Sequence, residues 1–518
     1  MSFIGLDLNH DTMSKNVLKS IISGSIWGIV SKLCDSAAKF ITIPLLIGFY
    51  GKSDYGLIAL AFSLNAYLRL MDMGFTVGSI RYFSIWIAEG KWDKVQNVAR
   101  SSVVFYSVIG LINACVFLYV GCFGSGFFNL IGSQAIVFKW MMFVLAGSAI
   151  VNWSFSVVNQ LLTAHGEIGW VNKTTLISSL LNFAIAYIAV KLNLSLPIYF
   201  LLYIISTVIT IPINIFRLRI YKLPILSFLL PKWNKVAFGE VFKYSAGIFA
   251  MGLFQFSADS LRPILLGKFA SNGISVLTDY RVIQTISMLV MAFGSVFMQV
   301  LLPSTSKVFA EKDQQKIDTI LFKGTKYISI LLCFLVFNIV CSSENLLVVY
   351  MGTSYEHLAI WLNIWLVTLL YMHNTPVSSF ILSTGKTTFL IYTSAISCLV
   401  SLPVTVVLAS RYNIGAAVMG YAVYIVLQLG FSYFYYLPKV LKINSYQIFV
   451  KNFLPSLLIG SSCCIVAYYV SNFIVSPHKL YLIVLTSLLF STMYLVLILK
   501  FVLNQGEIAF IVKKFRTK

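Results

Sequence analysis

Long apolar stretches separated by short polar segments run through almost the whole chain. A helix needs about 20 consecutive apolar residues to cross the hydrocarbon core of a bilayer, and each stretch is long enough to do so. Fourteen spans are predicted, at roughly 21–48, 55–80, 101–123, 135–160, 174–192, 195–216, 242–267, 274–302, 325–342, 358–382, 387–410, 413–437, 452–473 and 479–503. Arg411, Asn413 and Gly415 mark the boundary between 387–410 and 413–437. The pattern therefore predicts an all-α polytopic membrane protein of about 14 transmembrane helices.

Composition excludes a soluble globular protein, because 59% of the residues are hydrophobic and only 11% are charged. No polar segment is long enough to fold as a soluble domain. The residues before Ile21 are polar and lack a small-residue cleavage site, so they do not predict a removable signal peptide. The eight cysteines form no CxxC motif and fall mostly in apolar stretches, which predicts small buried side chains and neither a metal site nor a disulfide framework.

The net charge of +21 is distributed unevenly between alternate connecting segments. One set is rich in lysine and arginine, for example at Lys94, Arg217 and Lys316, whereas the other holds little beyond residues such as Lys191 and Arg411. The positive-inside rule then predicts that both termini are cytoplasmic. Anionic membrane lipids are the expected partners of this charge, and no nucleic acid is expected.

Short matches between the two halves of the chain indicate an internal duplication. The segment 44–48 matches 263–267, and 71–74 matches 291–294 at almost the same offset. A repeat of six spans keeps both copies in one orientation, so the halves are predicted to be parallel repeats. The expected domains are an N-terminal six-helix lobe (1–230), a C-terminal six-helix lobe (231–445), and two C-terminal helices with a cytoplasmic tail (446–518).

Ten ionisable residues lie within or at the edge of predicted spans, where each charge costs roughly 2.5–3.5 kcal/mol on insertion scales. Six are cations, so we expect them to line an aqueous path that binds an anion: Lys32, Lys39, Arg69, Arg81, Arg262 and Arg281. Four are acids that either pair with these cations or couple transport to an ion: Asp35, Asp72, Asp259 and Asp279. The alternative is a set of structural ion pairs between helices, although four carboxylates do not balance six cations.

Other polar and helix-breaking residues fall inside the spans. Pro44 and Pro263 occupy the same place in the repeat and are predicted to bend their helices, either as a moving joint or as a fixed kink. His373 is expected to be a packed core histidine. A further group is expected to line a cavity or to bond between helices: Asn159, Gln160, Asn182, Gln255 and Gln284.

The sequence contains no phosphate-binding loop, nucleophile elbow or metal-ligand cluster. The protein is therefore expected not to be an enzyme and to need no cofactor. A coupling ion, either a proton or a sodium ion, is left open.

Several short segments, taken in order, resemble one family of transporters. They are 43–48 (IPLLIG), 54–57 (DYGL), 72–75 (DMGF), 303–306 (PSTS) and 347–352 (LVVYMG) with Tyr355. The chain resembles a Wzx-type polysaccharide or O-antigen flippase, of the polysaccharide transporter branch of the multidrug/oligosaccharidyl-lipid/polysaccharide (MOP) exporter superfamily.

The resemblance implies a bilobed fold with a central cationic cavity in a bacterial inner membrane. It implies a flippase that moves undecaprenyl-pyrophosphate-linked oligosaccharide repeat units from the cytoplasmic to the outer leaflet by alternating access, for lipopolysaccharide or another surface polysaccharide. The implied partners are that lipid-linked oligosaccharide, a polysaccharide polymerase and a chain-length regulator, and the implied state is a monomer. The sequence does not name the sugar.

Two other functions are weighed against this one. A membrane glycan polymerase or glycosyltransferase needs acidic catalytic residues on a sizeable outer loop, and the longest predicted outer segments, 121–134 and 342–357, are short. A cation-coupled small-molecule exporter of the multidrug type, from the same superfamily, is the stronger alternative.

Overall fold

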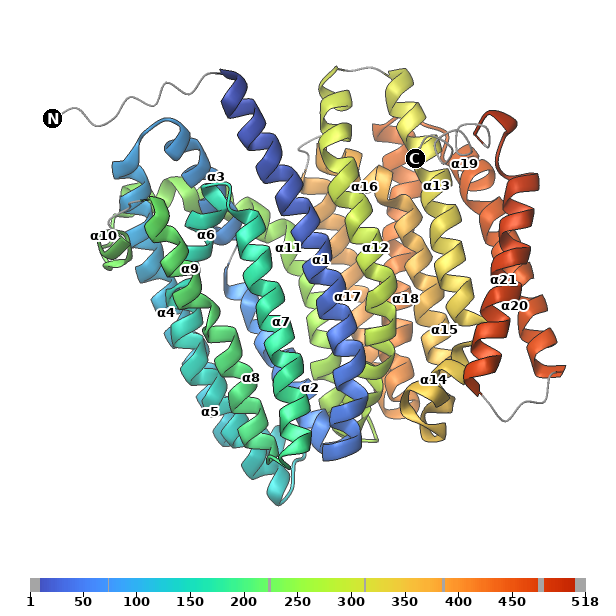
Figure 1. Cartoon of the computed structure of the whole chain (residues 1–518), viewed down its shortest axis with the longest axis horizontal. Coiled ribbons are helices and arrows are strands. Elements are labelled where there is room, and N and C mark those ends of the chain that lie inside the picture. The colour runs from blue at the N-terminus through green and yellow to red at the C-terminus, as the bar shows by residue number, and fades with distance from the viewer. Residues whose placement is uncertain are drawn as a thin grey trace. The chain divides into compact units, whose positions relative to one another are not determined.

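The computed structural model describes residues 10–72, 74–221, 225–311, 314–383, 387–473 and 479–507 (Figure 1). These residues form helices joined by turns and include no strand, so the predicted all-α fold is confirmed. Both ends of the chain, which are predicted to be cytoplasmic, lie outside the described residues. The chain divides into two compact units, Met1–Thr278 and Asp279–Lys518. The lobes predicted from the repeat, with boundaries at 230/231 and 445/446, stay a prediction.

The first unit is built from eleven α-helices in the part of the chain described. They are α1 (His10–Tyr50), α2 (Lys52–Leu68), α3 (Phe75–Ala88), α4 (Trp92–Phe127), α5 (Ser133–Ser154), α6 (Ser156–Ala164), α7 (Ile168–Lys191), α8 (Leu196–Val208), α9 (Thr210–Leu218), α10 (Ile225–Leu229) and α11 (Lys235–Phe269). Two 3₁₀ segments, η1 (Arg69–Asp72) and η2 (Arg219–Tyr221), complete it.

The second unit contains most of α12 (Ser275–Glu311), whose residues up to Thr278 belong to the first unit. It continues with α13 (Gln314–Val340), α14 (Ser343–Met351), η3 (Thr353–Leu358), α15 (Ala359–Thr368), η4 (Leu369–Asn374), α16 (Thr375–Ser383), α17 (Thr387–Tyr412), α18 (Ile414–Phe431), η5 (Ser432–Val440), α19 (Ser445–Ile448), η6 (Phe449–Phe453), α20 (Leu454–Phe473) and α21 (Lys479–Phe501). The segments η3 and η4 are 3₁₀ helices, and η5 and η6 are π-helical turns.

Ten helical segments among the described residues are long and apolar enough to cross a membrane, which makes this a multi-pass membrane protein. They are Val30–Tyr50, Trp92–Phe127, Ser133–Ala164, Ile168–Lys191, Leu196–Leu218, Gln314–Val340, Thr388–Tyr412, Ile414–Val440, Ser445–Ser471 and Lys479–Phe501. Of the other four predicted spans, 55–80 and 358–382 are interrupted by η1 and η4, and 242–267 and 274–302 fall on α11 and α12. The total of fourteen stays a prediction.

The predicted boundary between the eleventh and twelfth spans is confirmed. Helix α17 ends at Tyr412 and α18 begins at Ile414. Asn413 between them has φ 48°, a left-handed conformation that asparagine tolerates better than most residues.

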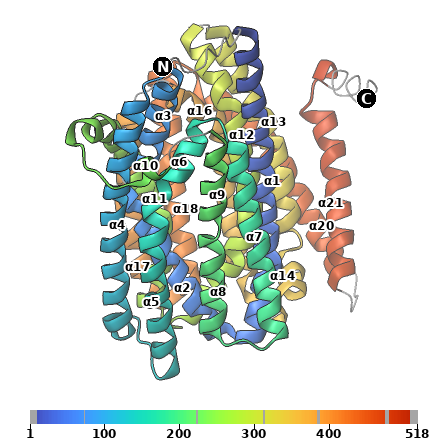
Figure 2. The same cartoon turned by 60° about the vertical axis from the view of Figure 1, so that its left-hand side comes forward.

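Helix pairs and aromatic packing hold the first unit together. Helix α1 lies along α7, and α4 lies along α5, while α11 packs on α2, α3 and α4 (Figure 2). Phe75 of α3 is fully buried and stacks on Phe238 of α11, with ring centroids 4.8 Å apart. Without a hydrophobic driving force between helices in lipid, such close packing supplies much of the stability.

Gly56 lies at a close approach between α2 and the turn that precedes α12. A Cβ atom at Gly56 of α2 would lie 2.6 Å from the carbonyl oxygen and 2.7 Å from Cγ2 of Ile274. We expect Gly56→Ala to destabilise the folded protein by about 1–3 kcal/mol, because the backbone at Ile274 must move to make room. Thermal unfolding of the purified protein measures this.

Gly126→Ala is the matched control for Gly56→Ala, since Gly126 lies in α4 with nothing within 4 Å of its added Cβ. It should be neutral or slightly stabilising, because alanine favours a helix. Equal melting temperatures for the two variants would contradict the close-approach argument.

In the second unit, α13 packs against α20 and α21, and α17 packs against α18. The Tyr494 hydroxyl of α21 donates to the carbonyl oxygen of Ile330 at 2.8 Å. His373 of η4 is buried, as predicted for a packed histidine. Its Nδ1 lies 2.6 Å from the carbonyl oxygen of Leu370, its Nε2 lies 2.7 Å from the Tyr433 hydroxyl, and its ring stacks on Phe453.

A group of hydrogen bonds after the end of α21 joins the C-terminal segment to α13. The Glu507 carboxylate accepts hydrogen bonds from Lys326 Nζ at 2.6 Å, from the Tyr327 hydroxyl at 2.8 Å and from the Asn504 backbone N–H at 2.9 Å. Burial by itself raises the pKa of Glu507, but these hydrogen bonds outweigh it and hold the pKa below its usual value.

A carboxylate whose folded pKa is lowered stabilises the folded state at neutral pH, and the contribution is lost as pH falls through the usual carboxylate range toward the folded pKa. We expect Glu507→Gln to lower the free energy of unfolding at pH 7 by about 1 kcal/mol, which is measured as a lower melting temperature. The difference from wild type should shrink as the medium is acidified. A difference that stays constant between neutral and acidic pH would rule out this charge contribution.

Candidate functional site

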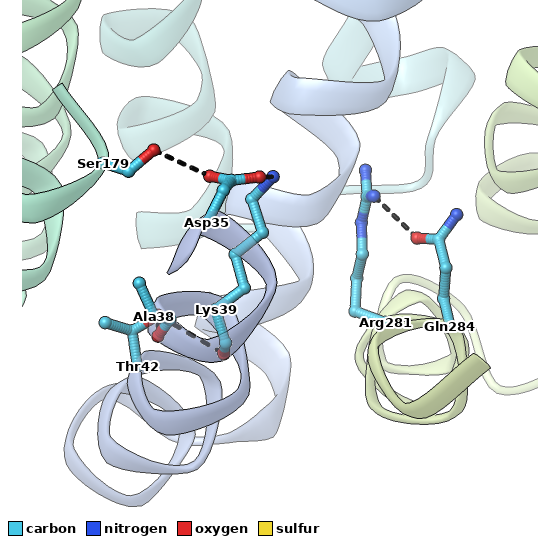
Figure 3. Close-up of polar contacts among 7 residues, drawn as sticks. All are labelled: Asp35, Ala38, Lys39, Thr42, Ser179, Arg281 and Gln284. Carbon is cyan, nitrogen blue, oxygen red and sulfur yellow. Dashed lines mark hydrogen bonds and ion pairs between the residues drawn. The ribbon is translucent and has the colours of Figure 1, made fainter. Parts of the chain in front are cut away.

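Helix α1 carries three of the predicted site residues on one face, at positions i, i+3 and i+7. Lys39 Nζ lies 2.6 Å from Asp35 Oδ2, and the Ser179 hydroxyl of α7 donates to Asp35 Oδ1 at 3.0 Å (Figure 3). Lys39 and Asp35 remain 48% and 37% exposed, and Lys32 is also exposed. The acid is therefore held between two helices while its cationic neighbours stay accessible.

Both predicted helix bends fall inside continuous helices, because α1 runs through Pro44 and α11 runs through Pro263. The Thr42 hydroxyl donates to the carbonyl oxygens of Ala38 at 2.9 Å and Lys39 at 3.4 Å, in the turn before Pro44 (Figure 3). The bends themselves stay a prediction.

The second predicted span is broken in its middle. Helix α2 ends at Leu68, η1 follows, and Gly74 has φ 68° before α3 begins at Phe75. Glycine adopts this left-handed conformation without strain, so it suits the start of a new helix direction. Arg69 is exposed in η1, and Arg81 is exposed on α3 with its guanidinium 5.2 Å from the centre of the Tyr82 ring.

Asp72, at the end of η1, belongs to a network of neutral hydrogen-bonding groups. Its Oδ1 accepts from the Tyr106 hydroxyl of α4 and the Thr76 hydroxyl of α3, each at 2.7 Å, and its Oδ2 accepts from the Thr76 backbone N–H at 3.2 Å. Gln160 Nε2 of α6 in turn donates to the Tyr106 hydroxyl at 2.8 Å and to the Thr76 hydroxyl at 3.1 Å. Among the described contacts, no ion pair joins Asp72 to Arg69.

Arg262 of α11 is the most deeply buried of the six cations. Its side chain is 2% exposed and its Nη1 lies 3.4 Å from Asp259 Oδ1, whereas Asp259 itself is 54% exposed. The guanidinium is therefore enclosed by its neighbours, while the carboxylate of the pair remains exposed.

The two site residues predicted on α12 lie in the second unit. Asp279 is buried, with 4% of its surface exposed. Arg281 Nη1 donates to Gln284 Oε1 on the next turn at 2.8 Å (Figure 3).

The structure thus pairs Asp35 with Lys39 and Asp259 with Arg262, and it leaves Lys32, Arg69 and Arg81 exposed on apolar helices. A common cationic cavity stays a prediction. Gln160 does bond between helices, as expected, and so do Asn159 with Asn214 and Asn182 with Ser206. Gln284 bonds within its own helix, and Gln255 is exposed.

Three residues that donate hydrogen bonds to the site acids were not predicted from the sequence: Thr76, Tyr106 and Ser179. Thr76 had a usable signal, because it follows Asp72 by one helical turn. Tyr106 and Ser179 lie far along the chain from the acids they contact, and no sequence spacing links them.

No family model and no curated protein matches the sequence. Solved structures do match the fold. One is described as "Lipid II flippase MurJ, inward closed conformation", with a TM-score of 0.68 and 13% identity over 91% of this chain and 98% of that one. The chain has the fold of a MOP-superfamily transporter.

Two further structures support that assignment of the fold. An inward-facing MATE multidrug resistance transporter of the MOP superfamily matches with a TM-score of 0.60 and 14% identity, over 82% of this chain and 95% of that chain. A MOP-superfamily transporter from Pyrococcus furiosus, described as having a binding pocket of reverse polarity, matches with a TM-score of 0.56 and 15% identity, over 86% and 96%. These neighbours are transporters and flippases rather than enzymes.

Proposed function

We propose that this protein is a flippase for undecaprenyl-pyrophosphate-linked oligosaccharide repeat units, of O-antigen or a similar surface polysaccharide. It moves them from the cytoplasmic to the outer leaflet of a bacterial inner membrane by alternating access through a cationic central cavity. The observation that carries the proposal is the set of exposed cations on otherwise apolar helices, Lys32, Lys39, Arg69 and Arg81. Hydrocarbon does not accommodate such charges, so they require water or an anion beside them.

A lipid-linked oligosaccharide matches this chemistry. Its pyrophosphate carries about two negative charges, which lysine and arginine bind through charge-assisted hydrogen bonds. Its sugar hydroxyls cannot cross hydrocarbon unaided. A membrane potential that is negative inside favours outward movement of the anion by about 2.3 kcal/mol per charge per 100 mV.

The extent of the structural match also supports a lipid-linked substrate. The lipid II flippase covers 91% of this chain, whereas the two transporters described above cover 82% and 86%. Under this proposal the protein acts as a monomer alongside a polysaccharide polymerase and a chain-length regulator, and anionic lipids contact its basic cytoplasmic segments.

A transport assay tests the proposal. Purified protein in liposomes receives fluorescent undecaprenyl-pyrophosphate oligosaccharide in one leaflet, and a membrane-impermeant reagent measures its appearance in the other. Protein-dependent flipping is expected. Its rate should fall when an oligosaccharide pyrophosphate without the undecaprenyl chain is added as a competitor. Failure to flip this lipid, together with gradient-driven efflux of a cationic dye, would instead support a small-molecule exporter, which the multidrug neighbours favour.

A further inference from the structure

Four of the eight cysteines lie in the part of the second unit where the C-terminal helices pack on α13. Cys333 belongs to α13 and Cys341 directly follows that helix, while Cys463 and Cys464 are neighbours in α20. All four side chains are buried, and none of them is in a disulfide. The two pairs lie far apart in the chain, so only the tertiary structure brings these thiols to one interface.

A close contact at Gly460 defines how α20 lies on α13. A Cβ atom at Gly460 would lie 2.5 Å from Cδ2 of Phe337 and 3.4 Å from Cβ of Cys333. A small residue at this point lets two membrane helices approach closely. Four residues further along each chain segment, about one helical turn, Gly460 is followed by Cys464 and Phe337 by Cys341. This register predicts that Cys341 and Cys464 face each other.

The side chains of Cys341 and Cys464 do meet. Their thiols are hydrogen-bonded to each other. Cys341 is also held at the end of α13, because its backbone N–H donates to the Phe337 carbonyl oxygen at 3.0 Å and its S–H lies 3.1 Å from the Asn338 carbonyl oxygen. The sulfur of Cys341 is therefore kept in place by its own helix while it contacts the second one.

The other two cysteines of the group have different surroundings. Cys333 and Cys463 both interact electrostatically with the Tyr494 hydroxyl of α21. Among the described contacts, no hydrogen bond joins the Cys333 thiol to the Cys463 thiol. The group therefore consists of one pair of thiols in contact and two separate thiols.

We propose that Cys341 and Cys464 are a redox-sensitive thiol pair that forms a disulfide between α13 and α20 when the protein meets a peroxide. The Cys464 thiolate attacks one peroxide oxygen, the O–O bond breaks, and Cys464 becomes a sulfenic acid while the other oxygen leaves as hydroxide. The Cys341 sulfur then attacks the Cys464 sulfur, and the sulfenic oxygen leaves as water. In sum, two thiols lose two electrons and two protons, and hydrogen peroxide becomes two water molecules.

Burial and hydrogen bonding select both the oxidant and the order of the steps. Cys464 is 8% exposed and Cys341 is 3% exposed, so a small uncharged oxidant reaches them where a protein disulfide does not. The thiolate is the nucleophile, and an S–H of Cys341 that donates to the Cys464 sulfur stabilises the thiolate there. A metal centre does not compete for these thiols, because no group of three or more histidine, cysteine or acidic side chains in the described residues could hold a metal.

The disulfide ties the two C-terminal helices covalently to α13. In the reduced protein these helices are joined to α13 by packing and by hydrogen bonds such as those from the Tyr494 hydroxyl to the Ile330 carbonyl oxygen at 2.8 Å and from Asn338 Nδ2 to the Ser491 hydroxyl at 3.0 Å. A disulfide restricts the unfolded chain, so the oxidised protein should melt at a higher temperature than the reduced one. The inference does not depend on which molecule is transported.

Differential alkylation of the full chain in lipid tests the proposal. The purified protein is treated with hydrogen peroxide and denatured, and its remaining thiols are blocked with one isotopic form of an alkylating reagent. After reduction, the newly freed thiols take the second isotopic form. Mass spectrometry should find the second form in equal amounts on Cys341 and Cys464, and the first form on Cys333 and Cys463. The first form on both Cys341 and Cys464 would overturn the proposal.

Cys464→Ala and Cys463→Ala are a matched pair of variants, because the two residues are adjacent and both are buried in α20. Cys464→Ala should abolish the reduction-dependent label on Cys341, whereas Cys463→Ala should leave it unchanged. If Cys464→Ala does not fold, the peptide pair that contains Cys341 and Cys464, recovered from the oxidised wild type without reduction, decides the question. A disulfide from Cys341 to Cys463 or Cys333, or one between two copies of the chain, would overturn the proposed pair.

Discussion

Replacement of Arg69 by alanine is expected to reduce export of lipid-linked glycan by at least about tenfold while the protein still inserts and folds. Arg69 is exposed in the break of the second span and has no described ion-pair partner. Its loss therefore leaves no buried carboxylate unpaired, and the fold should tolerate it. A charge-assisted hydrogen bond to pyrophosphate contributes about 1.5–3 kcal/mol, which corresponds to a tenfold or larger effect.

Lys32→Ala should act in the same way, since Lys32 is exposed on α1. Surface glycan at native expression and flipping in liposomes measure both variants. Lys91→Ala is a suitable control, because Lys91 is an exposed lysine in the turn before α4, where it pairs with Glu89 at 2.7 Å. Normal glycan levels from both the Arg69 and the Lys32 variant would refute the anion-binding role of these cations.

Arg262→Ala is expected to abolish export for a different reason. The sequence alone predicts a loss of substrate binding, but the Arg262 side chain is only 2% exposed. Truncation of so large a buried side chain leaves a cavity, so we expect the folded protein to lose at least about 2 kcal/mol of stability. Thermal unfolding in detergent and the yield of folded protein measure this loss.

Two companion variants separate packing from charge at this position. Arg262→Met retains most of the volume and should recover stability but not export, whereas Arg262→Lys should recover part of both. Asp259→Asn should lower the free energy of unfolding only slightly, because the Asp259 side chain is 54% exposed. An Arg262→Ala protein as stable as wild type would show that the buried guanidinium does not support the fold.

The apolar stretches alone predicted the helical membrane fold, because about 20 apolar residues in a row leave few other structures in a bilayer. The turn at Asn413 was also visible, since polar residues interrupt an otherwise continuous run. The break at η1 was not predicted, although Gly74 marks it. The residues of an interrupted span are as apolar as those of a continuous one. The mean hydropathy over the length of a span therefore does not reveal the interruption.

The site was predictable only in part. Intrahelical spacing placed Asp35 beside Lys39 and Asp259 beside Arg262, because a turn of helix fixes those distances. Burial could not be predicted in the same way: Arg69 and Arg262 both lie in apolar runs, yet one is exposed and the other is enclosed by its neighbours. The partners of Asp72 come from α4 and α6, which only the tertiary structure brings to it.

The broken second span has a consequence for the order in which the protein is made. Helix α2 has 17 residues and α3 has 14, so at 1.5 Å per residue they are only about 26 and 21 Å long, each shorter than the hydrocarbon core of about 30 Å. The two helices enter the membrane with a break in the α-helix between them, and the Asp72 carboxylate lies at that break. Tyr106 and Gln160 lie later in the chain, so they reach the membrane after this segment does. The second span therefore reaches its final hydrogen bonding only after α4 and α6 have been synthesised. Until then, the insertion machinery or water must supply hydrogen-bond partners to the polar groups at the break.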